Sequence, residues 1–345
     1  MKKTKTVFLV LFVVLMISMV LANSFGSAKI KLDDILYIIY NGVLDNESAL
    51  PEAYLPINDI IWLLHLPRII LAACIGCGLA VCGVVMQAIV KNPLADPYIL
   101  GISSGASLGA TAAILLGIGV ALGENFVGIA AFIGAFFVSL LVVFIANLGG
   151  RASSTKLILS GMALSAVCSA FASFIVYFAN NAEGMQNITY WLMGSLAGAK
   201  WELLEIIVPI SVLSTLFFYT QSRILNLLLL GDEAAITLGK DLHIYRQCYL
   251  LVSAIVVGFA VYAAGMIGFI GLIIPHAVRI LVGSDHKVLV PVSGLSGAIF
   301  LIWADVLCRV IIPRTELPIG ILISLIGAPC FVYLMIKKTY GFGGN

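Results

Sequence analysis

Long apolar runs recur along this chain of 345 residues and are separated by shorter polar connections. A helix needs about 20 apolar residues to cross the hydrocarbon core of a bilayer, because every backbone polar group must be satisfied internally there. The pattern therefore predicts ten membrane-spanning helices, at residues 7–24, 64–90, 98–120, 127–148, 157–179, 203–220, 247–266, 268–283, 289–311 and 317–336. The eighth is the weakest, because it is short and contains Pro275, His276 and Arg279.

Composition supports the same class of protein. Hydrophobic residues make up 61% of the chain and charged residues only 10%, against roughly 45–50% and roughly 25% in soluble domains. This balance excludes a soluble enzyme, and a net charge of +2 gives no basic excess that would favour nucleic-acid binding. We expect an all-α fold, a polytopic transmembrane bundle of about ten helices, and a single domain over residues 1–345, because no low-complexity linker divides the chain.

The distribution of basic residues predicts the orientation of the bundle, since cytoplasmic loops carry the excess of Lys and Arg. With the N-terminus inside, thirteen of the nineteen lie on the cytoplasmic side, namely Lys2, Lys3, Lys5, Lys91, Arg151, Lys156, Arg223, Lys240, Arg246, Arg279, Lys287, Lys337 and Lys338. Both termini are then cytoplasmic. Residues 25–63 form a long extracytoplasmic segment and residues 221–246 a long cytoplasmic loop, and long loops in compact bundles are usually functional.

Two local patterns each allow two interpretations. The basic N-terminus and the apolar stretch after it fit a signal peptide cleaved near Ala22 or Ala28, or an uncleaved first helix, which we favour because the rest of the chain is membrane-embedded. Cys74 and Cys77 form a C-x-x-C without a second pair or a nearby His. We favour helix packing over a metal site for them.

Small residues mark the second predicted span and the start of the third. Gly and Ala are frequent between residues 66 and 90, and because small residues let helix backbones approach closely, we expect this helix inside the bundle. The run at 101–109 is also small and weakly polar. It fits a packed helix interface or the lining of a polar pathway.

Two chemically distinctive side chains lie within predicted spans. An acid in a span, such as Asp305, is costly and by default functional, but Arg309 follows four residues later at the spacing of a helical ion pair. We favour this local pair over a proton relay. His276 has no clustered partner, so we favour a structural role over ligation of a metal or haem, and we expect no cofactor.

Six blocks of sequence carry a resemblance to a known family. They are LPRIILAACIGCGLAVCGVVMQAIVKNPLADPYILGISSGAS, GRASSTKLILSGMAL, ITYWLMGSL, GDEAAITLG, GMIGFIGLIIPHAVR and ELPIGILISLIGAPCFVYLMIKK. In these blocks, from about Leu64 to Lys338, the chain resembles the permeases of bacterial ABC importers for iron-siderophores, haem and cobalamin. The resemblance implies a ten-helix permease in the bacterial cytoplasmic membrane. It also implies a second permease copy around a central pathway, two ATPase subunits and an extracytoplasmic substrate-binding protein.

The resemblance also assigns roles to individual residues. It places ATPase coupling in the cytoplasmic loop, where we expect contacts from Ala234, Leu238 and Gly239, with Asp232 and Glu233 in the same segment. Arg68 and Arg309 match arginines that meet acids of the docking binding protein, although each also fits an Arg that reaches the lipid headgroups. A cytoplasmic gate is implied at Asn92, Leu94, Ser154 and Thr155. His65 and Arg314 depart from the family pattern, so docking is expected to differ in detail.

The chain itself lacks the residues for ATP hydrolysis. A phosphate-binding loop needs G-x-x-x-x-G-K-[ST], but Gly239-Lys240 has Ala234 at the first position and Asp241 after the Lys. We therefore expect a transport permease whose ATPase is a separate subunit. The expected cargo is an iron-siderophore, the commonest in the family, with haem and cobalamin as alternatives. An ion-coupled secondary transporter is a weaker alternative, because Asp305 is its only clear intramembrane carboxylate.

Overall fold

The computed structural model describes residues 2–26, 30–44, 51–123, 125–148, 150 and 152–337, and within these ranges it contains helices and connections but no strand. The α-helices are α1 (Lys2–Leu21), α2 (Leu32–Val43), α3 (Leu55–Asp59), α4 (Leu66–Val90), α5 (Ile102–Leu116), α6 (Phe126–Asn147), α7 (Ser154–Ala179), α8 (Ala182–Met193), α9 (Trp201–Thr220), α10 (Ser222–Leu230), α11 (Asp232–Thr237), α12 (His243–Ala264), α13 (Ile270–Val282), α14 (His286–Val310) and α15 (Ile319–Lys337). Short helical turns join several of them, including the π-helical η4 (Ile60–His65) between α3 and α4.

All ten predicted spans correspond to helices. Within the described residues, seven helical stretches are long and apolar enough to cross a membrane, and three shorter apolar helices occupy the remaining predicted positions. The second span extends well beyond its predicted start, because η3 (Glu52–Tyr54), α3, η4 and α4 form one helical stretch of 39 residues, Glu52–Val90. At about 1.5 Å per residue this stretch is about 58 Å long, so its first turns project out of the bilayer.

Helix α4 forms the centre of the bundle, as its small residues predict. It packs against α14, α9, α13 and α12, and 19 of its 25 residues are buried. A Cβ at Gly76 would overlap the backbone of Gly297 in α14, and a Cβ at Gly83 would overlap the backbone of Gly271 in α13. The glycines therefore allow two neighbouring helix backbones to touch α4 directly.

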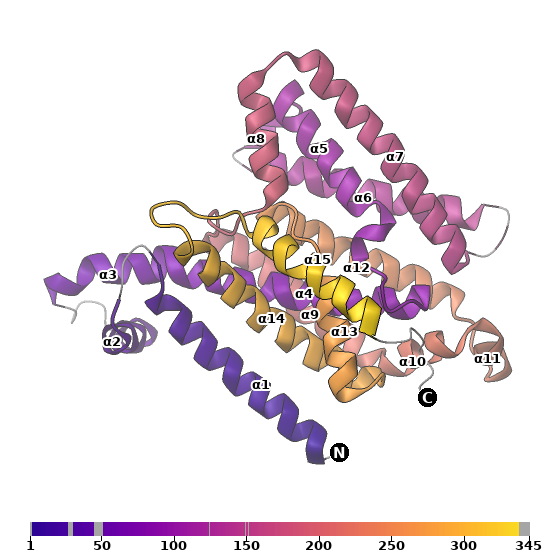
Figure 1. Ribbon diagram of the computed structural model, residues 1–345, viewed down its shortest axis with the longest axis horizontal. Helices are drawn as coiled ribbons and strands as arrows, with labels where there is room; N and C mark the ends of the chain where they lie inside the picture. Colours follow the sequence, from indigo (N-terminus) through magenta and orange to yellow (C-terminus); the bar gives the residue numbers. More distant parts are fainter. Residues whose placement is uncertain are drawn as a thin grey trace.

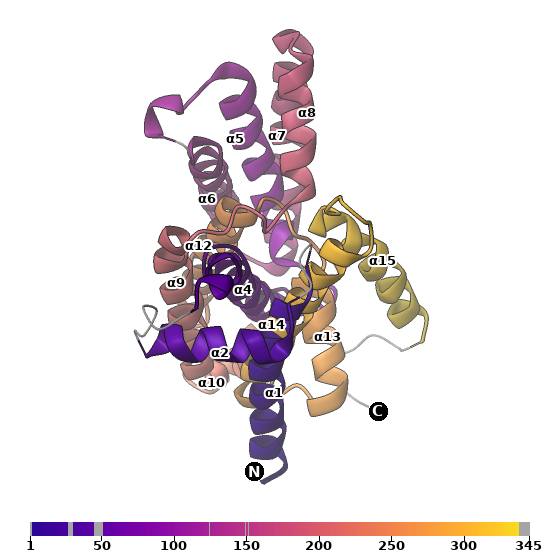
Figure 2. The same ribbon diagram turned by 90° about the vertical axis from the view of Figure 1, so that its left-hand side faces the viewer.

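A second group of helices stands apart from the α4 group. Helices α5 to α8 form an upper lobe in Figure 1, which Figure 2 shows from the side. Within it, Gly105 and Gly109 of α5 lie against the backbone of α6 at Gly134 and Ala130, which confirms helix packing for this part of the 101–109 run. Helix α12 connects the two groups by packing against α6.

The two ends of the bundle carry different additional helices. Helices α10 and α11 lie at the right-hand end in Figure 1, where α1 begins and α15 ends, and α2 and α3 lie at the opposite end. We call these the inner end and the outer end, following the orientation that the charge pattern predicts. Helix α1 packs along α14, where Trp303 Nε1 donates a hydrogen bond of 3.0 Å to Ser18 Oγ.

The C-x-x-C cysteines pack against α9. Ser211 Oγ donates to the carbonyl oxygen of Cys74 at 2.9 Å, and Cys77 Sγ lies 3.5 Å from Thr215 Oγ1. Both contacts fit the helix-packing interpretation. His276 is half-buried in α13, and the described part of the chain has no group of three His, Cys, Asp or Glu residues that could hold a metal ion.

Candidate functional site

The predicted coupling segment forms two short helices joined by a glycine. Gly231 separates α10 from α11 and has a φ of +102°, a conformation that favours glycine over other residues. A Cβ at this position would also lie 2.9 Å from Lys91 Nζ, at the end of α4. The backbone conformation of the bend between α10 and α11 therefore favours glycine, whereas the Lys91 side chain is able to shift.

Two polar side chains attach this segment to the rest of the bundle. Asn226 in α10 donates from Nδ2 to Asp285 Oδ1 at 2.9 Å, and its Oδ1 accepts from the backbone N of His286 at 3.0 Å. The bond from Asn226 lowers the pKa of the Asp285 carboxyl. In this way α10 is bonded to the turn between α13 and α14.

Arg246 attaches the second helix. Its side chain is only 5% exposed, and Nη2 donates to Asp232 Oδ1 at 2.8 Å, while Nη1 donates to the carbonyl oxygen of Ala152 at 3.1 Å. One arginine of α12 thus holds both the start of α11 and the residue shortly before α7. This role of Arg246 was not predicted, because no local spacing in the sequence pairs it with Asp232.

Beyond these attachments, the segment exposes apolar side chains at the inner end. Leu230 is 65% exposed, Ile236 58%, Leu238 62% and Ile244 71%, and we call these four residues the inner apolar face. The other coupling residues lie in or beside α11, with Ala234 half-buried, and Asp232, Glu233 and Gly239 exposed. Exposed apolar residues grouped at the end of a bundle are typical of a surface for another protein.

The predicted gate residues also lie at the inner end. Asn92 Oδ1 accepts from the backbone N of Leu94 at 2.9 Å, in the turn after α4. Ser154 Oγ donates to the carbonyl oxygen of Ile89 at 3.1 Å, so the first residue of α7 is bonded to the last turn of α4. Thr155 is exposed beside it. Arg151, in the same family block, lies outside the described residues.

At the outer end, four charged side chains come together. Arg68 Nη2 lies 2.9 Å from Asp305 Oδ1, and Arg68 Nη1 lies 2.9 Å from Glu316 Oε2. Arg309 Nε lies 3.1 Å from Asp305 Oδ2, and Arg309 Nη1 donates to the carbonyl oxygen of Phe25 at 2.8 Å. Asp305, only 2% exposed, is therefore shared by two arginines.

This cluster bears on two predictions. The helical pair of Asp305 with Arg309 is confirmed. The side chains of Arg68 and Arg309, which the family resemblance assigns to docking, are 12% and 4% exposed and are engaged inside the chain. The pair of Arg68 with Asp305 was not predicted, because 237 residues separate them, and Glu316 was not predicted as the outer partner of Arg68.

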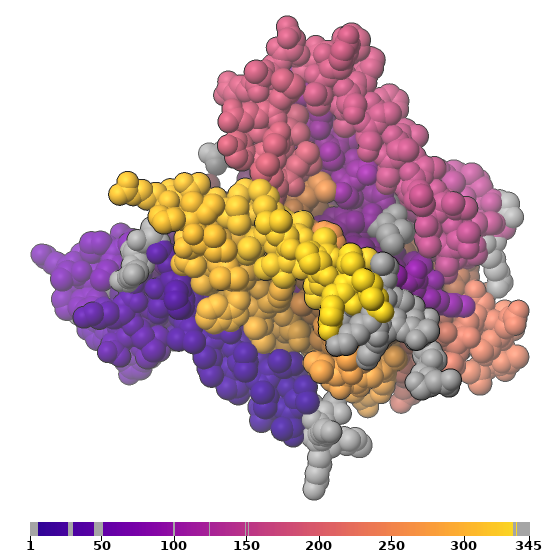
Figure 3. All heavy atoms as spheres, viewed as in Figure 1, coloured from indigo at the N-terminus to yellow at the C-terminus, as the bar shows by residue number. Residues whose placement is uncertain are grey.

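A hollow of about 420 Å³ opens on the surface between α5, α7 and α8. Ser107 and Thr111 of α5 and Ser173 and Tyr177 of α7 contribute to its lining. The 101–109 run thus has two faces, one packed on α6 through Gly105 and one turned to this weakly polar hollow. Figure 3 shows the lobe that contains it standing out above α15.

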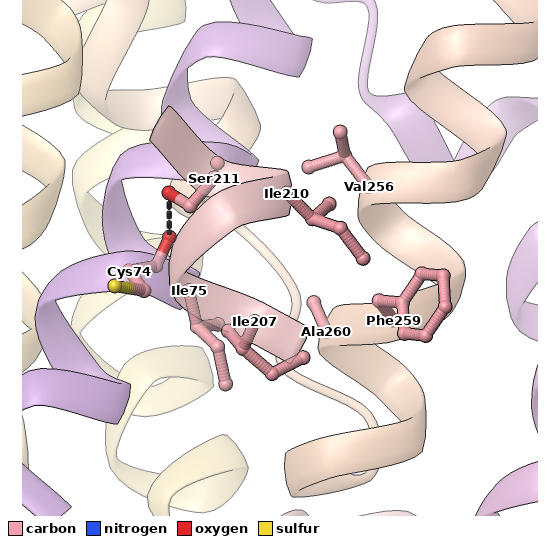
Figure 4. Close-up of a pocket in the computed structure, with 9 residues that line it drawn as sticks. Cys74, Ile75, Ile207, Ile210, Ser211, Val256, Phe259 and Ala260 are labelled. Carbon is pink, nitrogen blue, oxygen red and sulfur yellow. Dashed lines mark hydrogen bonds between the residues drawn. The ribbon is translucent and has the colours of Figure 1, made fainter. Parts of the chain in front are cut away.

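The helix crossing between α4, α9 and α12 is closely packed by comparison. Figure 4 shows its cavity, lined by Ile75, Ile207 and Phe259 among others, with the hydrogen bond from Ser211 to Cys74 at its edge. The cavity measures about 10 Å³, which is room for about one water molecule. A bulky solute therefore has no room between these three helices.

Comparisons with known proteins agree on one family. The model of the FecCD transport family matches residues 13–337. The cobalamin import system permease protein BtuC of Halobacterium salinarum is 44% identical over 276 residues, which are 80% of this chain and 73% of that protein. The hemin transport system permease protein HmuU of Yersinia pestis is 40% identical over 293 residues, which are 81% and 85% of the two chains. A solved metal-chelate type ABC transporter in an inward-facing conformation matches with a TM-score of 0.82 and 32% identity, over 97% of this chain and 100% of that one.

Proposed function

Because the chain belongs to the FecCD transport family and is the permease of an ABC importer, we propose that it passes a metal complex of the cobalamin or haem type across the bacterial cytoplasmic membrane. It does so with a second copy of itself, two ATPase subunits and a substrate-binding protein. The observation that carries the assembly is the inner apolar face, most of which lies on a segment bonded to two other parts of the bundle.

The choice of cargo is supported by the named relatives. One is a permease for cobalamin and another a permease for hemin, and both compounds are large, flat macrocycles around a central metal. An iron-siderophore was expected from the sequence only because that cargo is the commonest in the family. The cobalamin and haem alternatives are now favoured over it, and the siderophore becomes the competitor to be tested.

The inner apolar face is proposed as the contact with the ATPase. Leu238 and Ile236 insert into a groove of that subunit, and the exposed Gly239 and half-buried Ala234 allow close approach. Movement of α11 then reaches α12 through the bond of Asp232 with Arg246, and movement of α10 reaches α14 through Asn226. The attached helices move the turns that hold Asn92, Leu94, Ser154 and Thr155, which form the cytoplasmic gate.

The hollow between α5, α7 and α8 is proposed as one wall of the transport pathway. Helix α7 is mostly exposed, with only four of its 26 residues buried, and Ser169 and Ser173 are exposed on it. A second copy facing this side encloses the hollow and gives a weakly polar channel, from which a bulky cargo is able to leave.

Docking of the binding protein is proposed at the outer end. Arg68 offers Nη1 to Glu316, which is 46% exposed, so a carboxylate of the binding protein competes there with Glu316. Arg309 does not contact the binding protein directly, because its guanidinium group is bound to Asp305 and to the carbonyl oxygen of Phe25. It holds Asp305 in place beside Arg68. Both arginines thus belong to the docking region, but Arg68 makes the exchangeable contact.

The test of the assembly is capture of the ATPase by a tagged chain from its native host. Leu238→Asp is expected to reduce the captured ATPase at least tenfold, because the charge enters an apolar contact. This change avoids Gly239, whose φ of +74° makes any larger residue strained. Thr315→Asp, exposed at the outer end, is the control and should capture as much ATPase as the parent chain. Equal capture by both variants would contradict the proposed contact.

The test of the cargo uses the captured transporter with its binding protein in liposomes loaded with ATP. Labelled cyanocobalamin, hemin and a ferric siderophore are compared for uptake. We expect accumulation of cyanocobalamin or hemin and none of the siderophore. Uptake of the siderophore alone would contradict the cargo and leave the permease assignment intact.

A further inference from the structure

The outer segment between the first two spans forms a small core of its own. Ile30, Ile35 and Ile38 pack with Ile61 of η4, and these four residues form a cluster separate from the main core. Gly42 of α2 lies so close to Trp62 that a Cβ would overlap the indole ring. One side of α2 is therefore fixed against the outward extension of α4.

Helix α2 lies across the direction of the membrane spans. In Figure 1 α2 is seen end-on, while α4 and α14 lie lengthwise in the plane of the picture. In Figure 2, turned by 90°, α2 runs across the view and α4 is seen end-on. Because α4 spans the bilayer, α2 lies close to parallel with the membrane plane.

The length of the second span gives the depth of α2. The helical stretch from Ile61 to Val90 rises about 44 Å at about 1.5 Å per residue. A bilayer measures about 40–45 Å when its headgroup layers are included. With Val90 at the inner boundary, Ile61 and the helix packed on it lie at the outer headgroup layer.

The side of α2 that faces away from the bundle begins with the exposed Asp33 and is apolar from Leu36 to Val43. Leu36 is 49% exposed, Tyr40 66% and Val43 71%, and these residues lie opposite Ile35 and Ile38 on the helix. We call Leu36, Tyr40 and Val43 the outer face of α2. A helix in water would carry polar residues on such a face, so the outer face needs a cover.

Two neighbouring features favour lipid as the cover. Helix α1, which precedes this segment at the edge of the bundle, is only 17% buried within its span, so the surface leading to α2 already faces lipid. Aromatic residues gather at the same level, where Trp201 Nε1 donates to the carbonyl oxygen of Trp62 at 2.8 Å and their rings lie 6.1 Å apart. Trp and Tyr are enriched at membrane interfaces in this way.

We propose that α2 is an interfacial helix whose outer face, Leu36, Tyr40 and Val43, is inserted in the headgroup layer of the outer leaflet. The inference requires only that the chain spans the membrane and is independent of cargo and partners. The charged residues in the first turn of α2 are Asp33 and Asp34, and both are acidic. Insertion therefore rests on apolar area, and a zwitterionic lipid is sufficient.

The experiment measures the depth of a spin label on the full chain in phosphatidylcholine vesicles, without partner proteins. A label at Val43→Cys is compared with one at Thr315→Cys, an exposed outer connection, and the unsubstituted chain corrects for labelling of the exposed Cys248. Dissolved oxygen concentrates in lipid, whereas a nickel chelate stays in water. We expect the oxygen-to-nickel accessibility ratio to be several-fold higher at Val43 than at Thr315, and Tyr40→Cys to repeat the result.

Two outcomes would overturn the proposal. Equal ratios at Val43 and Thr315 would place the outer face of α2 in water. Exclusion of both reagents from Val43 and Tyr40 would mean that a protein surface, such as a second copy, covers the helix. Since Val43 and Tyr40 are exposed, neither substitution removes a packing contact, and either result reports on the folded chain.

Discussion

At the scale of single residues, the buried Asp305 shows what local spacing predicts and where it stops. The pair with Arg309 follows from a separation of four residues on one helix, and the structure confirms it. The pair with Arg68 depends on α4 packing beside α14, which no short-range pattern encodes. The same limit applies to Arg246 and Asp232, whose contact requires the fold of the whole inner end.

The two acids bound to Arg68 give the first prediction. Asp305→Asn leaves buried guanidinium groups without their shared charge, and we expect it to lower the free energy of unfolding by roughly 3–5 kcal/mol. Glu316→Gln removes a partner that is 46% exposed and should cost roughly 0–1 kcal/mol. Thermal unfolding in detergent, followed by a dye that reacts with buried cysteines, measures both. Equal losses of unfolding free energy in the two variants would contradict the prediction that the buried acid contributes more to stability than the exposed one.

Asp96 gives a prediction that depends on pH. It lies in the turn after α4, where burial raises the pKa of its carboxyl to about 6, while Oδ1 accepts from the backbone N of Tyr98. An unfolded Asp ionises near pH 4, so folding is penalised above that pH, and the penalty is complete above about pH 6. Asp96→Asn keeps the acceptor and removes the charge.

The variant should therefore be more stable than the parent at pH 8, by on the order of 3 kcal/mol, and the difference should shrink as the pH falls from 6 to 4. Thermal unfolding midpoints of the parent chain and the variant, measured from pH 4 to pH 8, test whether the variant is the more stable one and whether its advantage grows with pH. A difference that stays constant with pH would contradict an ionised, desolvated carboxylate at this position.

At the scale of helices, span positions were predictable, whereas α2 and α8 were not. The length of an apolar run is fixed by bilayer thickness, so each of the ten predicted runs contains a helix. Helices α2 and α8 have only 12 residues each, which is too short for a span, and they were absent from the prediction. The small residues of α4 predicted close packing, but only the structure identifies which glycine touches which neighbour.

Gly83 supplies the prediction at this scale. A Cβ there would overlap the backbone of Gly271, which has no rotamer to change, so Gly83→Ala should push α13 away and cost about 1–3 kcal/mol. Gly78→Ala, on the same helix, meets only Val256 Cγ1 at 2.9 Å, a side chain that is able to shift. The thermal unfolding midpoint of Gly78→Ala should therefore be well above that of Gly83→Ala. The reverse order would mean that α4 and α13 are not in backbone contact.

At the scale of the whole molecule, the location of a transport route depends on how the helices are grouped. The crossing of α4, α9 and α12 leaves a cavity of about 10 Å³, whereas the hollow between α5, α7 and α8 measures about 420 Å³ and lies on the surface. The sequence indicated that residues 101–109 pack or line a pathway, and could not show that one face packs on α6 while another lines the hollow. A route on the surface of one chain becomes enclosed only when a second chain covers it.

This arrangement predicts water beside α7 in the assembled transporter. Ser173 lies in the hollow, while Phe137 of α6 is 58% exposed on an apolar surface that we expect to face lipid. A membrane-impermeant thiol reagent should modify Ser173→Cys at least ten times faster than Phe137→Cys in proteoliposomes, because thiols react as thiolates, which form in water and not in lipid. The unsubstituted chain gives the background of the native cysteines, among which Cys248 is exposed. Equally slow modification at both positions would place the hollow in lipid, and the transport route would then have to be sought on another face of the chain.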